Sequence, residues 1–393
     1  MTLDSEAHAT PEANPASEVG GSPKASSGAS ETYAAHAAGH PGAQMTTITA
    51  VLVSYDESPQ QLRVAVDSLL AQTRAPMEIL IIDNSADGSS AKSVRDYADE
   101  IKVIEPGSNL GYAPAINLAA ARASGEYLLT LNPDAQVEAE CLERLAAVAD
   151  SDPQILLVGA QILLEDGVTR NAGANPMHPT GISPAGGYGK PRETGELRDV
   201  AVVSGACCLI RREAFVRLGG FVDEFFVFYD DPDMGWRALI AGMRVVYCPD
   251  AIALHGYEFG RRGKRKWFLL ERNRLFSVLT NYEARTLALL SPLLIATELG
   301  LLGVAAYGRW LPQKLETYAS VLSLRKRLME QRRAVQASRR RSDAEVLELF
   351  EDRMDSALLP PPGPALANAV WVPYMRLVRL LLRVTAPRSR ESG

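Results

Sequence analysis

Short apolar runs alternate with segments of helical periodicity between residues 46 and 163. The first run, TTITAVLVSY (46–55), is rich in β-branched residues and precedes SPQQLRVAVDSLLAQ (58–72), where leucine and valine recur at helical spacing. This pair of patterns repeats three more times and closes with the run QILLVGAQIL (154–163). Strands that alternate with helices in this way form βαβ units. The sequence therefore predicts an α/β fold with a mainly parallel, doubly wound sheet.

Polar residues follow four of the predicted strands. In parallel α/β sheets, ligands bind outside the carboxyl ends of the strands, and these ends meet at one edge. Any one of these residues could be an ordinary turn residue, but four polar strand ends together favour a binding crevice. The residues concerned are Tyr55-Asp56, Asp83-Asn84, Asn109 and Asn132-Pro133-Asp134.

The first predicted strand lacks a glycine-rich phosphate loop. It runs into SYDESPQQ (54–61), and neither GxGxxG nor GxxxxGK[ST] follows it. A bound phosphate would therefore need another source of positive charge, and a divalent metal held by a carboxylate supplies one. Asp134, at the end of the fourth predicted strand, is placed to hold such a metal.

A second group of carboxylates lies in FVDEFFVFYDDPDMGWRALIAGM (221–243), where acids are interleaved with aromatic residues. Such surroundings raise the pKa of a carboxyl group toward the working range of a general base. The alternative is structural, because Asp230, Asp231 and Asp233 precede a predicted helix that carboxylates can cap. His255 ends another apolar run and is either a metal ligand or a structural residue.

The bulk composition is that of a globular protein, with 393 residues, of which 47% are hydrophobic and 22% charged. A net charge of −6 argues against a nucleic-acid partner. The four cysteines have no CxxC spacing, which argues against a zinc site or disulfide framework and fits a reducing, cytoplasmic environment. Residues 1–45 are rich in Ala, Ser, Gly, Pro and Glu and lack the features of a secretory signal, so we expect a disordered tail.

Eight motifs occur in order between residues 47 and 282. They are VSYD (53–56), IIDNSADGS (81–89), GSNLGYAPAIN (107–117), LLTLNPDAQV (128–137), SGACCLIRR (204–212), FVDEFFVFYDDPDMGWR (221–237), LHG (254–256) and ERNRLF (271–276). As a set, they resemble the GT-A fold glycosyltransferases of family 2, with the closest likeness to the rhamnosyltransferase-like branch. The resemblance implies a GT-A, Rossmann-like nucleotide-diphospho-sugar transferase fold.

The resemblance also implies a pocket for a nucleoside-diphosphate sugar and a divalent metal, Mg²⁺ or Mn²⁺. In this pocket, Tyr55 would lie near the base and Asp83 would accept a hydrogen bond from the pyrimidine N3–H. The implied donor-binding residues are Tyr55, Asp83, Asn109, Gly111, Asn132 and Gly205. Asp134 matches the last acid of the metal-binding DxD signature, and His255 matches the histidine that completes the site. Asn132 replaces the first acid of that signature and is a neutral ligand at best.

In the same family, the second acid of an "ED" motif is the general base, and Asp231 matches it; Asp230 stands where the family has glutamate. Arg272-Asn273 matches a late motif near the donor or acceptor. The implied reaction is a single inverting displacement, in which Asp231 deprotonates an acceptor hydroxyl. The implied donor is a dTDP- or UDP-sugar carrying rhamnose or a related hexose. The implied acceptor is a glycan or polyprenyl-linked glycan in cell-envelope polysaccharide synthesis.

The C-terminal part contains a long apolar segment, TLALLSPLLIATELGLLGVAAYGRW (286–310), about the length of a membrane span. Pro292 and Glu298 weaken that interpretation, so a buried or interfacial hairpin remains an alternative. Basic amphipathic stretches follow it, which favours attachment to an anionic membrane surface over a solvated helical appendage. We therefore expect a cytoplasmic protein, peripheral at the inner face of the cell membrane.

These patterns divide the chain into a tail (1–45), a GT-A catalytic domain (46–282) and a helical, membrane-associated C-terminal region (283–393). Two rival functions remain. A sugar nucleotidyltransferase would also use an α/β sheet and a metal, but needs a glycine-rich loop that the first strand lacks. A catalytically impaired homologue acting as a membrane scaffold is allowed by Asn132 and disfavoured by Asp231 and His255.

Overall fold

The computed structural model describes residues 46–55, 57–97, 99–256, 263–353 and 364–384. The expected disordered tail, residues 1–45, and Asp56 of the first polar strand end lie outside the described residues.

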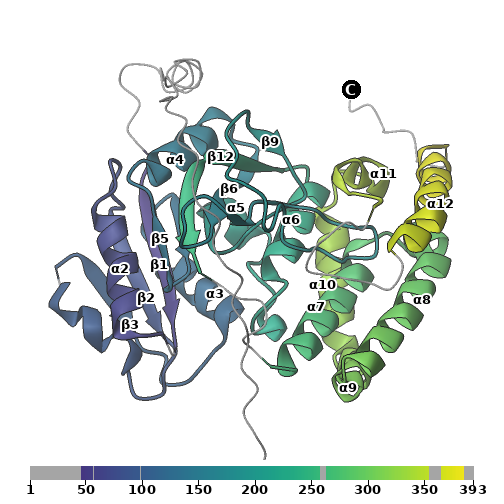
Figure 1. Ribbon diagram of the computed structural model, residues 1–393, viewed down its shortest axis with the longest axis horizontal. Coiled ribbons are helices and arrows are strands. Elements are labelled where there is room, and N and C mark those ends of the chain that lie inside the picture. The colour runs from purple at the N-terminus through teal and green to yellow at the C-terminus, as the bar shows by residue number, and fades with distance from the viewer. Residues whose placement is uncertain (1–45, 56, 98, 257–262, 354–363, 385–393) are drawn as a thin grey trace, which may run out of the picture.

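A ten-stranded mixed sheet forms the N-terminal half of the molecule (Figure 1). Its N-terminal strands pair in parallel, in the order β3-β2-β1-β4. They are β1 (Ile48–Ser54), β2 (Glu78–Asp83), β3 (Ile101–Ile104) and β4 (Tyr127–Leu131). All residues of β1, β2 and β4 are buried, which explains why their sequences are mostly apolar. The predicted α/β class and the parallel pairing are confirmed.

The second half of the sheet mixes directions. An antiparallel strand, β11, lies between β4 and β6, and β6 pairs in parallel with β12. The end of β12 pairs in turn with the short antiparallel strand β5. The bounds are β5 (Ala135–Val137), β6 (Ile155–Leu163), β11 (Cys207–Arg211) and β12 (Arg244–His255). The glycine-rich stretch between β6 and β11 contributes β7 (Arg170–Ala172), β8 (Ala174–Asn175), β9 (Arg198–Asp199) and β10 (Val202–Val203).

Helices cover both faces of the sheet. Val51 and Val53 of β1 face the side packed by α3, α5 and α6, while Ala50 and Leu52 face the side packed by α2 and α4. The helices are α2 (Pro59–Leu70), α3 (Tyr112–Arg122), α4 (Cys141–Ser151), α5 (Arg212–Arg217) and α6 (Asp230–Ile240). A short 3₁₀ turn, η2 (Asp223–Phe225), precedes α6.

The second predicted helical segment, SAKSVRDYADE (90–100), forms a 3₁₀ helix, η1 (Ser90–Tyr97). Its two buried residues, Ala91 and Val94, are three positions apart, which matches three residues per turn better than 3.6. The Asp83 carboxylate also accepts a hydrogen bond from Ala91 N, at 2.9 Å, and fixes the start of the segment.

The C-terminal third of the chain is helical and packs against α6 (Figure 1). It contains α7 (Arg265–Asn281), α8 (Ala284–Tyr307), α9 (Leu311–Ser323), α10 (Arg325–Ser338), α11 (Asp343–Val346), η3 (Leu347–Leu349) and α12 (Pro364–Val384). Trp236 of α6 stacks edge-on against Tyr282 and Phe350, with centroid distances of 4.6 and 5.3 Å. The C-terminal helices therefore share one hydrophobic core with the sheet domain.

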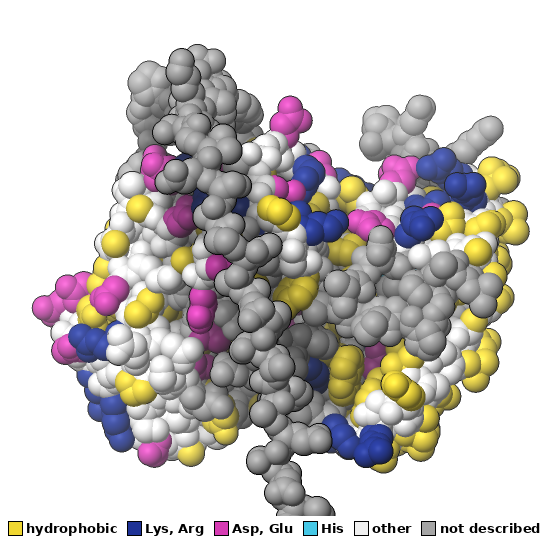
Figure 2. Space-filling view, in the orientation of Figure 1, with side chains coloured by type: hydrophobic (Ala, Val, Ile, Leu, Met, Phe, Trp, Pro, Cys, Tyr) yellow, Lys and Arg dark blue, Asp and Glu magenta, His cyan; other side chains and the backbone are white. Residues whose placement is uncertain are grey.

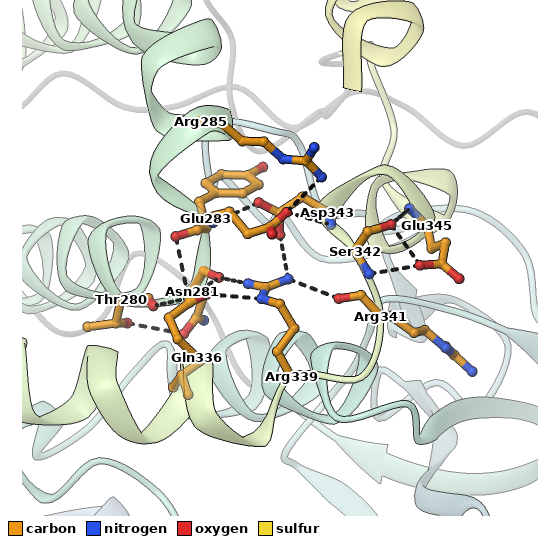
Figure 3. A network of polar contacts seen from close by, with 12 residues as sticks. Thr280, Asn281, Glu283, Arg285, Gln336, Arg339, Arg341, Ser342, Asp343 and Glu345 are labelled. Carbon is orange, nitrogen blue, oxygen red and sulfur yellow. Dashed lines mark hydrogen bonds and ion pairs between the residues drawn. The ribbon is translucent and has the colours of Figure 1, made fainter. Parts of the chain in front are cut away.

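A polar network fixes the turn between α7 and α8 onto α10 and α11 (Figure 3). Asp343, fully buried, accepts from Glu283 N at 2.7 Å and from Arg339 Nη1 at 2.8 Å. Arg339 Nη2 also donates to the carbonyl of Asn281, and Asn281 Nδ2 donates to Asp233 of α6 at 3.1 Å. The network thus links the start of α8 to the helix that carries the candidate base.

Candidate active site

The turn between β4 and β5 and the last residue of β12 form one corner of the candidate site. β5 pairs with β12 so that Ala135 lies opposite His255. His255 Nε2 consequently lies 3.1 Å from Asp134 Oδ1 and 3.3 Å from Asn132 Nδ2. We call Asn132, Asp134 and His255 the β4–β5 corner.

The β4–β5 corner fits a divalent cation that takes its remaining ligands from a bound molecule. A carboxylate oxygen and an imidazole nitrogen converge there, and a third of the Asp134 side chain is exposed. The described parts of the chain contain no group of three or more His, Cys, Asp or Glu side chains that could hold a metal ion by themselves. A cation at this corner would therefore keep open positions for phosphate oxygens or water.

The second corner is built on a strained turn that precedes α6. Phe226, Phe228 and Tyr229 all have positive backbone φ angles, of 66°, 71° and 68°. Each such non-glycine residue costs about 1–3 kcal/mol, and such strain clusters at functional sites. Asp230 and Asp231 follow directly, in the first turn of α6. We call residues 226–231 the α6 corner.

The three acids of α6 have different surroundings. Asp233 is engaged structurally, since it accepts hydrogen bonds from Arg237 Nε at 2.6 Å and Ser277 Oγ at 2.8 Å. Asp231 Oδ2 accepts from Gly205 N at 3.1 Å and remains partly exposed, whereas Asp230 is buried. Tyr229 is the N-cap residue of α6, and its side chain makes no capping hydrogen bond. Side-chain capping of the helix therefore does not explain why these acids occur there.

Burial raises the pKa of both Asp230 and Asp231. The nearby charge of Asp231 raises the pKa of Asp230 further, while the hydrogen bond from Gly205 N lowers that of Asp231 and partly offsets its burial. Asp231 is therefore a partly exposed carboxylate with an elevated pKa, which is what a general base requires.

Arg272 and Asn273 of α7 hold the strained turn in place. Asn273 Nδ2 lies 2.8, 3.1 and 3.2 Å from the carbonyl oxygens of Phe228, Phe225 and Val227, and its side chain is fully buried. Arg272 Nη2 donates to the carbonyl of Phe225 at 3.0 Å. These contacts join α7 to the backbone of residues 225–228, at the start of the α6 corner. A position of Arg272 and Asn273 near the donor or acceptor stays a prediction.

The remaining residues predicted for the donor pocket lie along the carboxyl edge of the sheet. Asp83 is buried and accepts from Ser85 N at 3.0 Å, so its carboxylate anchors the turn after β2. Tyr55 is half exposed. Gly111 N donates to Asn109 Oδ1 at 2.8 Å, which closes a tight loop before α3.

This loop contacts the α6 corner. Ala113 N donates to the carbonyl of Phe226 at 3.1 Å, and a Cβ on Gly111 would lie 2.5 Å from that oxygen. Only glycine fits there, also because its φ is +87°. Asn84 Nδ2 donates to the Gly111 carbonyl at 3.1 Å and joins the end of β2 to the same loop.

Sequence reasoning missed two residues that connect the site. Tyr112 OH donates to the Gly205 carbonyl at 3.3 Å, and Thr130 Oγ1 lies 3.3 Å from the same oxygen and 3.2 Å from the Cys208 carbonyl. Both α3 and β4 therefore contact the residue that bonds to Asp231. Thr130 stands alone as a hydroxyl within the apolar run LLTL, which was the available signal. Tyr112 follows the required Gly111, and its position within a motif gave no indication of its partner.

Comparison with known proteins identifies the family of this chain. The sequence model of the family described as Glycosyl transferase family 2 matches residues 49–219. An N-acetylglucosaminyl-diphospho-decaprenol L-rhamnosyltransferase of Mycobacterium tuberculosis is 31% identical over 231 residues, which cover 52% of this chain and 74% of the relative. The O-antigen biosynthesis protein RfbC of Myxococcus xanthus is 34% identical over 228 residues, 55% of this chain but only 18% of that protein.

Among solved structures, GalNAc-T7 with UDP, GalNAc and Mn²⁺ is similar at a TM-score of 0.51 and 18% identity, over 61% of this chain and 49% of that one. That likeness concerns the fold alone and agrees with the GT-A architecture. The family match, the mycobacterial relative and the arrangement of the sheet lead to one conclusion. This chain belongs to glycosyl transferase family 2 and is a glycosyltransferase of GT-A fold.

Proposed function

We propose that the protein transfers rhamnose or a related hexose from a dTDP- or UDP-sugar to a hydroxyl of a glycan or polyprenyl-linked glycan. The reaction would take place at the cytoplasmic face of the membrane, in cell-envelope polysaccharide synthesis. The mycobacterial relative supports this choice, because its name specifies L-rhamnose and an N-acetylglucosaminyl-diphospho-decaprenol acceptor. The observation that carries the proposal is the partly exposed Asp231, bonded to Gly205 N at the carboxyl edge of a GT-A sheet.

Asp231 acts as the general base in this proposal. Its carboxylate accepts the proton of the acceptor hydroxyl, and that oxygen attacks the anomeric carbon as the bond to the diphosphate breaks. The Gly205 N–H holds one carboxylate oxygen, so the other can face the acceptor. A single displacement of this kind inverts the anomeric configuration. Asp230 acts through Asp231, because its proximity disfavours two simultaneous negative charges.

Asp134 and His255 would hold Mg²⁺ or Mn²⁺, which supplies positive charge to the leaving diphosphate when bound. Within the chain itself, the antiparallel pairing of β5 with β12 fixes the relative position of these two side chains. Asn132 contributes a neutral amide beside them. Tyr55, Asp83, Asn109 and Gly111 belong to the proposed donor pocket.

A donor panel tests the proposal. Purified protein with Mn²⁺ is incubated with dTDP- and UDP-sugars and membranes that carry lipid-linked acceptors. We expect transfer from one donor, with inverted anomeric configuration by NMR. Asp231→Asn should lower the rate about 10²–10⁴-fold. Asp223→Asn is the matched control, because Asp223 is an exposed acid of the same segment. Equal rates for Asp231→Asn and wild type would reject Asp231 as the base, and no transfer from any donor would reject the activity.

A further inference from the structure

Helix α8 is unusually apolar for its exposure. Its most apolar stretch of 18 residues has a mean hydropathy of 2.0, yet only 17% of that stretch is buried. Among the described helices, it alone is long and apolar enough to cross a membrane. Length and composition leave open whether it crosses a bilayer or lies along one.

The inner side of α8 carries its polar residues. Thr286 and Thr297 are buried, and Glu298 forms ion pairs with Arg274 of α7 and Lys314 of α9. Lys314 Nζ lies 2.7 Å from Glu298 Oε2, and the side chains of Arg274 and Lys314 are 3% and 0% exposed. Moving α8 into a bilayer would put a carboxylate in hydrocarbon and remove a counter-charge from two buried cations. These ion pairs therefore hold α8 against α7 and α9.

The outer side of α8 is apolar. Ile295, Leu299, Val304 and Tyr307 are 60%, 65%, 41% and 94% exposed. The other exposed positions between residues 288 and 307 are alanine, glycine, serine or proline, so this face carries no charge. A water-facing helix shows the opposite pattern, with its polar face outward. An apolar stripe of this length on a protein surface marks a contact with a lipid or a protein.

Helix α12 extends this face. Val370, Leu377, Leu380, Leu381 and Val384 are exposed at helical spacing. Tyr374 OH donates to the Leu289 carbonyl and joins α12 to α8. Figure 2 shows hydrophobic side chains gathered along the right-hand edge, where Figure 1 places α8 and α12. We call the exposed residues of α8 and α12 the outer apolar face.

Charge on α12 indicates what covers the outer apolar face. The helix contains Arg376, Arg379 and Arg383 and no acidic residue. Arg376 and Arg383 are exposed on the same helix as the exposed leucines. Arg383 forms an ion pair with Glu348, and Arg379 forms one with Asp352. An apolar stripe flanked by arginines is typical of helices that lie in the plane of an anionic membrane. A second protein would need an acidic residue matched to Arg376, whereas an anionic bilayer supplies negative charge all along its surface.

We propose that α8 and α12 dock together, in the plane of an anionic bilayer, through the outer apolar face, and that α8 does not cross the membrane. This inference rests on the membrane location in the proposed function and specifies the surface and the mode of contact. It would bring the catalytic domain to the surface where a polyprenyl-linked acceptor presents its glycan.

Vesicle flotation of the full chain tests the proposal. We expect binding to vesicles of phosphatidylcholine with phosphatidylglycerol, weaker binding to phosphatidylcholine alone, and release by alkaline carbonate. The double variants Ile295→Asp/Leu299→Asp and Leu377→Asp/Leu380→Asp should each lower binding at least about ten-fold. The control Val168→Asp/Val216→Asp should bind as wild type does, because these residues are equally exposed but lie on the catalytic domain. Arg376→Glu should weaken binding to the anionic vesicles only.

Three results would overturn the proposal. Resistance to carbonate would show that α8 spans the bilayer. Equal binding by the α8 variant and wild type would place the contact elsewhere. A dimer that covers the outer apolar face, without vesicle binding, would make a second copy its partner. All the substituted residues are exposed, and circular dichroism would verify folding. Flotation needs no sugar transfer, so a failed donor panel leaves this test intact, and a failed flotation leaves transfer to a water-soluble acceptor testable.

Discussion

Two pairs of largely buried carboxylates differ in their partners: one pair binds cations and the other does not. Glu271 and Glu298 share the cations Arg274 and Lys314. Asp230 and Asp231 make no ion pair within the described residues, and Asp231 is held instead by the Gly205 N–H. The first pair joins three helices, and the second lies in the candidate active site.

Their pKa values diverge for that reason. Burial opposes ionisation of Glu271, but Arg274 and Lys314 outweigh it and lower its pKa to about 2. Burial acts on Asp230 and Asp231 without a cation and raises the pKa of both. A carboxylate compensated by cations thus serves the fold, whereas an uncompensated one remains available to take up a proton.

The largest expected effect is a difference in the free energy of unfolding between a variant of the first pair and a variant of the second. Glu271→Gln leaves two buried cations with one counter-charge fewer, so we expect the free energy of unfolding to fall by about 3–5 kcal/mol. Asp231→Asn removes an uncompensated charge and should leave that free energy unchanged or raise it. Urea unfolding of both variants measures the difference. A similar loss in both would show that the carboxylates are not held differently.

Asp134 is a third kind of carboxylate, because it lies beside the imidazole of His255. If a metal supplies its positive charge, Asp134→Ala should weaken Mn²⁺-dependent donor binding about 100-fold or more. Asn132→Ala should weaken it about ten-fold or less, because a neutral amide contributes less. Calorimetric titration of the donor, with Mn²⁺ and with EDTA, measures both. Binding by Asp134→Ala that still depends on Mn²⁺ would place the metal elsewhere.

Asn273→Ala tests whether the strained turn maintains the α6 corner. Loss of its bonds to three carbonyls should cost about 1–3 kcal/mol of stability and lower kcat, with the donor Kd unchanged. Asn117→Ala is the matched control, since Asn117 Nδ2 bonds to the Phe221 carbonyl at 2.8 Å, outside that turn. It should lose stability but keep kcat. Equal kcat losses in both variants would assign Asn273 a structural role only.

A further expected effect is a pH dependence of stability. Because folding raises the pKa of Asp230, the folded state binds its proton more tightly than the unfolded state. Stability should therefore decrease as pH rises from about 4 to the raised pKa, by about 1.4 kcal/mol for each pH unit in that range. Asp230→Asn should flatten this slope, as measured by urea midpoints across that range. Glu271 acts oppositely, since its contribution is lost only as pH falls toward its pKa of about 2. An unchanged slope in Asp230→Asn would contradict burial as the cause.

Much of the site follows from local sequence. Apolar runs end at polar residues, and strands β1, β2 and β4 run in parallel, so their carboxyl ends meet at one edge. The aromatic residues around the acids at 230–233 predicted a raised carboxyl pKa for one of them, and the family resemblance indicated Asp231. The exception is η1, where the sequence predicted a helix but not its 3₁₀ period.

Local patterns were sufficient for the α/β order, the acids of the α6 corner and the apolar character of α8, because periodicity and motif spacing act over a few residues. The partners of these residues came from tertiary packing. His255 reaches Asp134 across 121 positions because β5 pairs with β12. Glu298, an anomaly in an apolar helix, becomes the ion-pair partner of two buried cations once α7 and α9 pack beside it. Such contacts depend on the register and packing of distant elements, which no local pattern encodes.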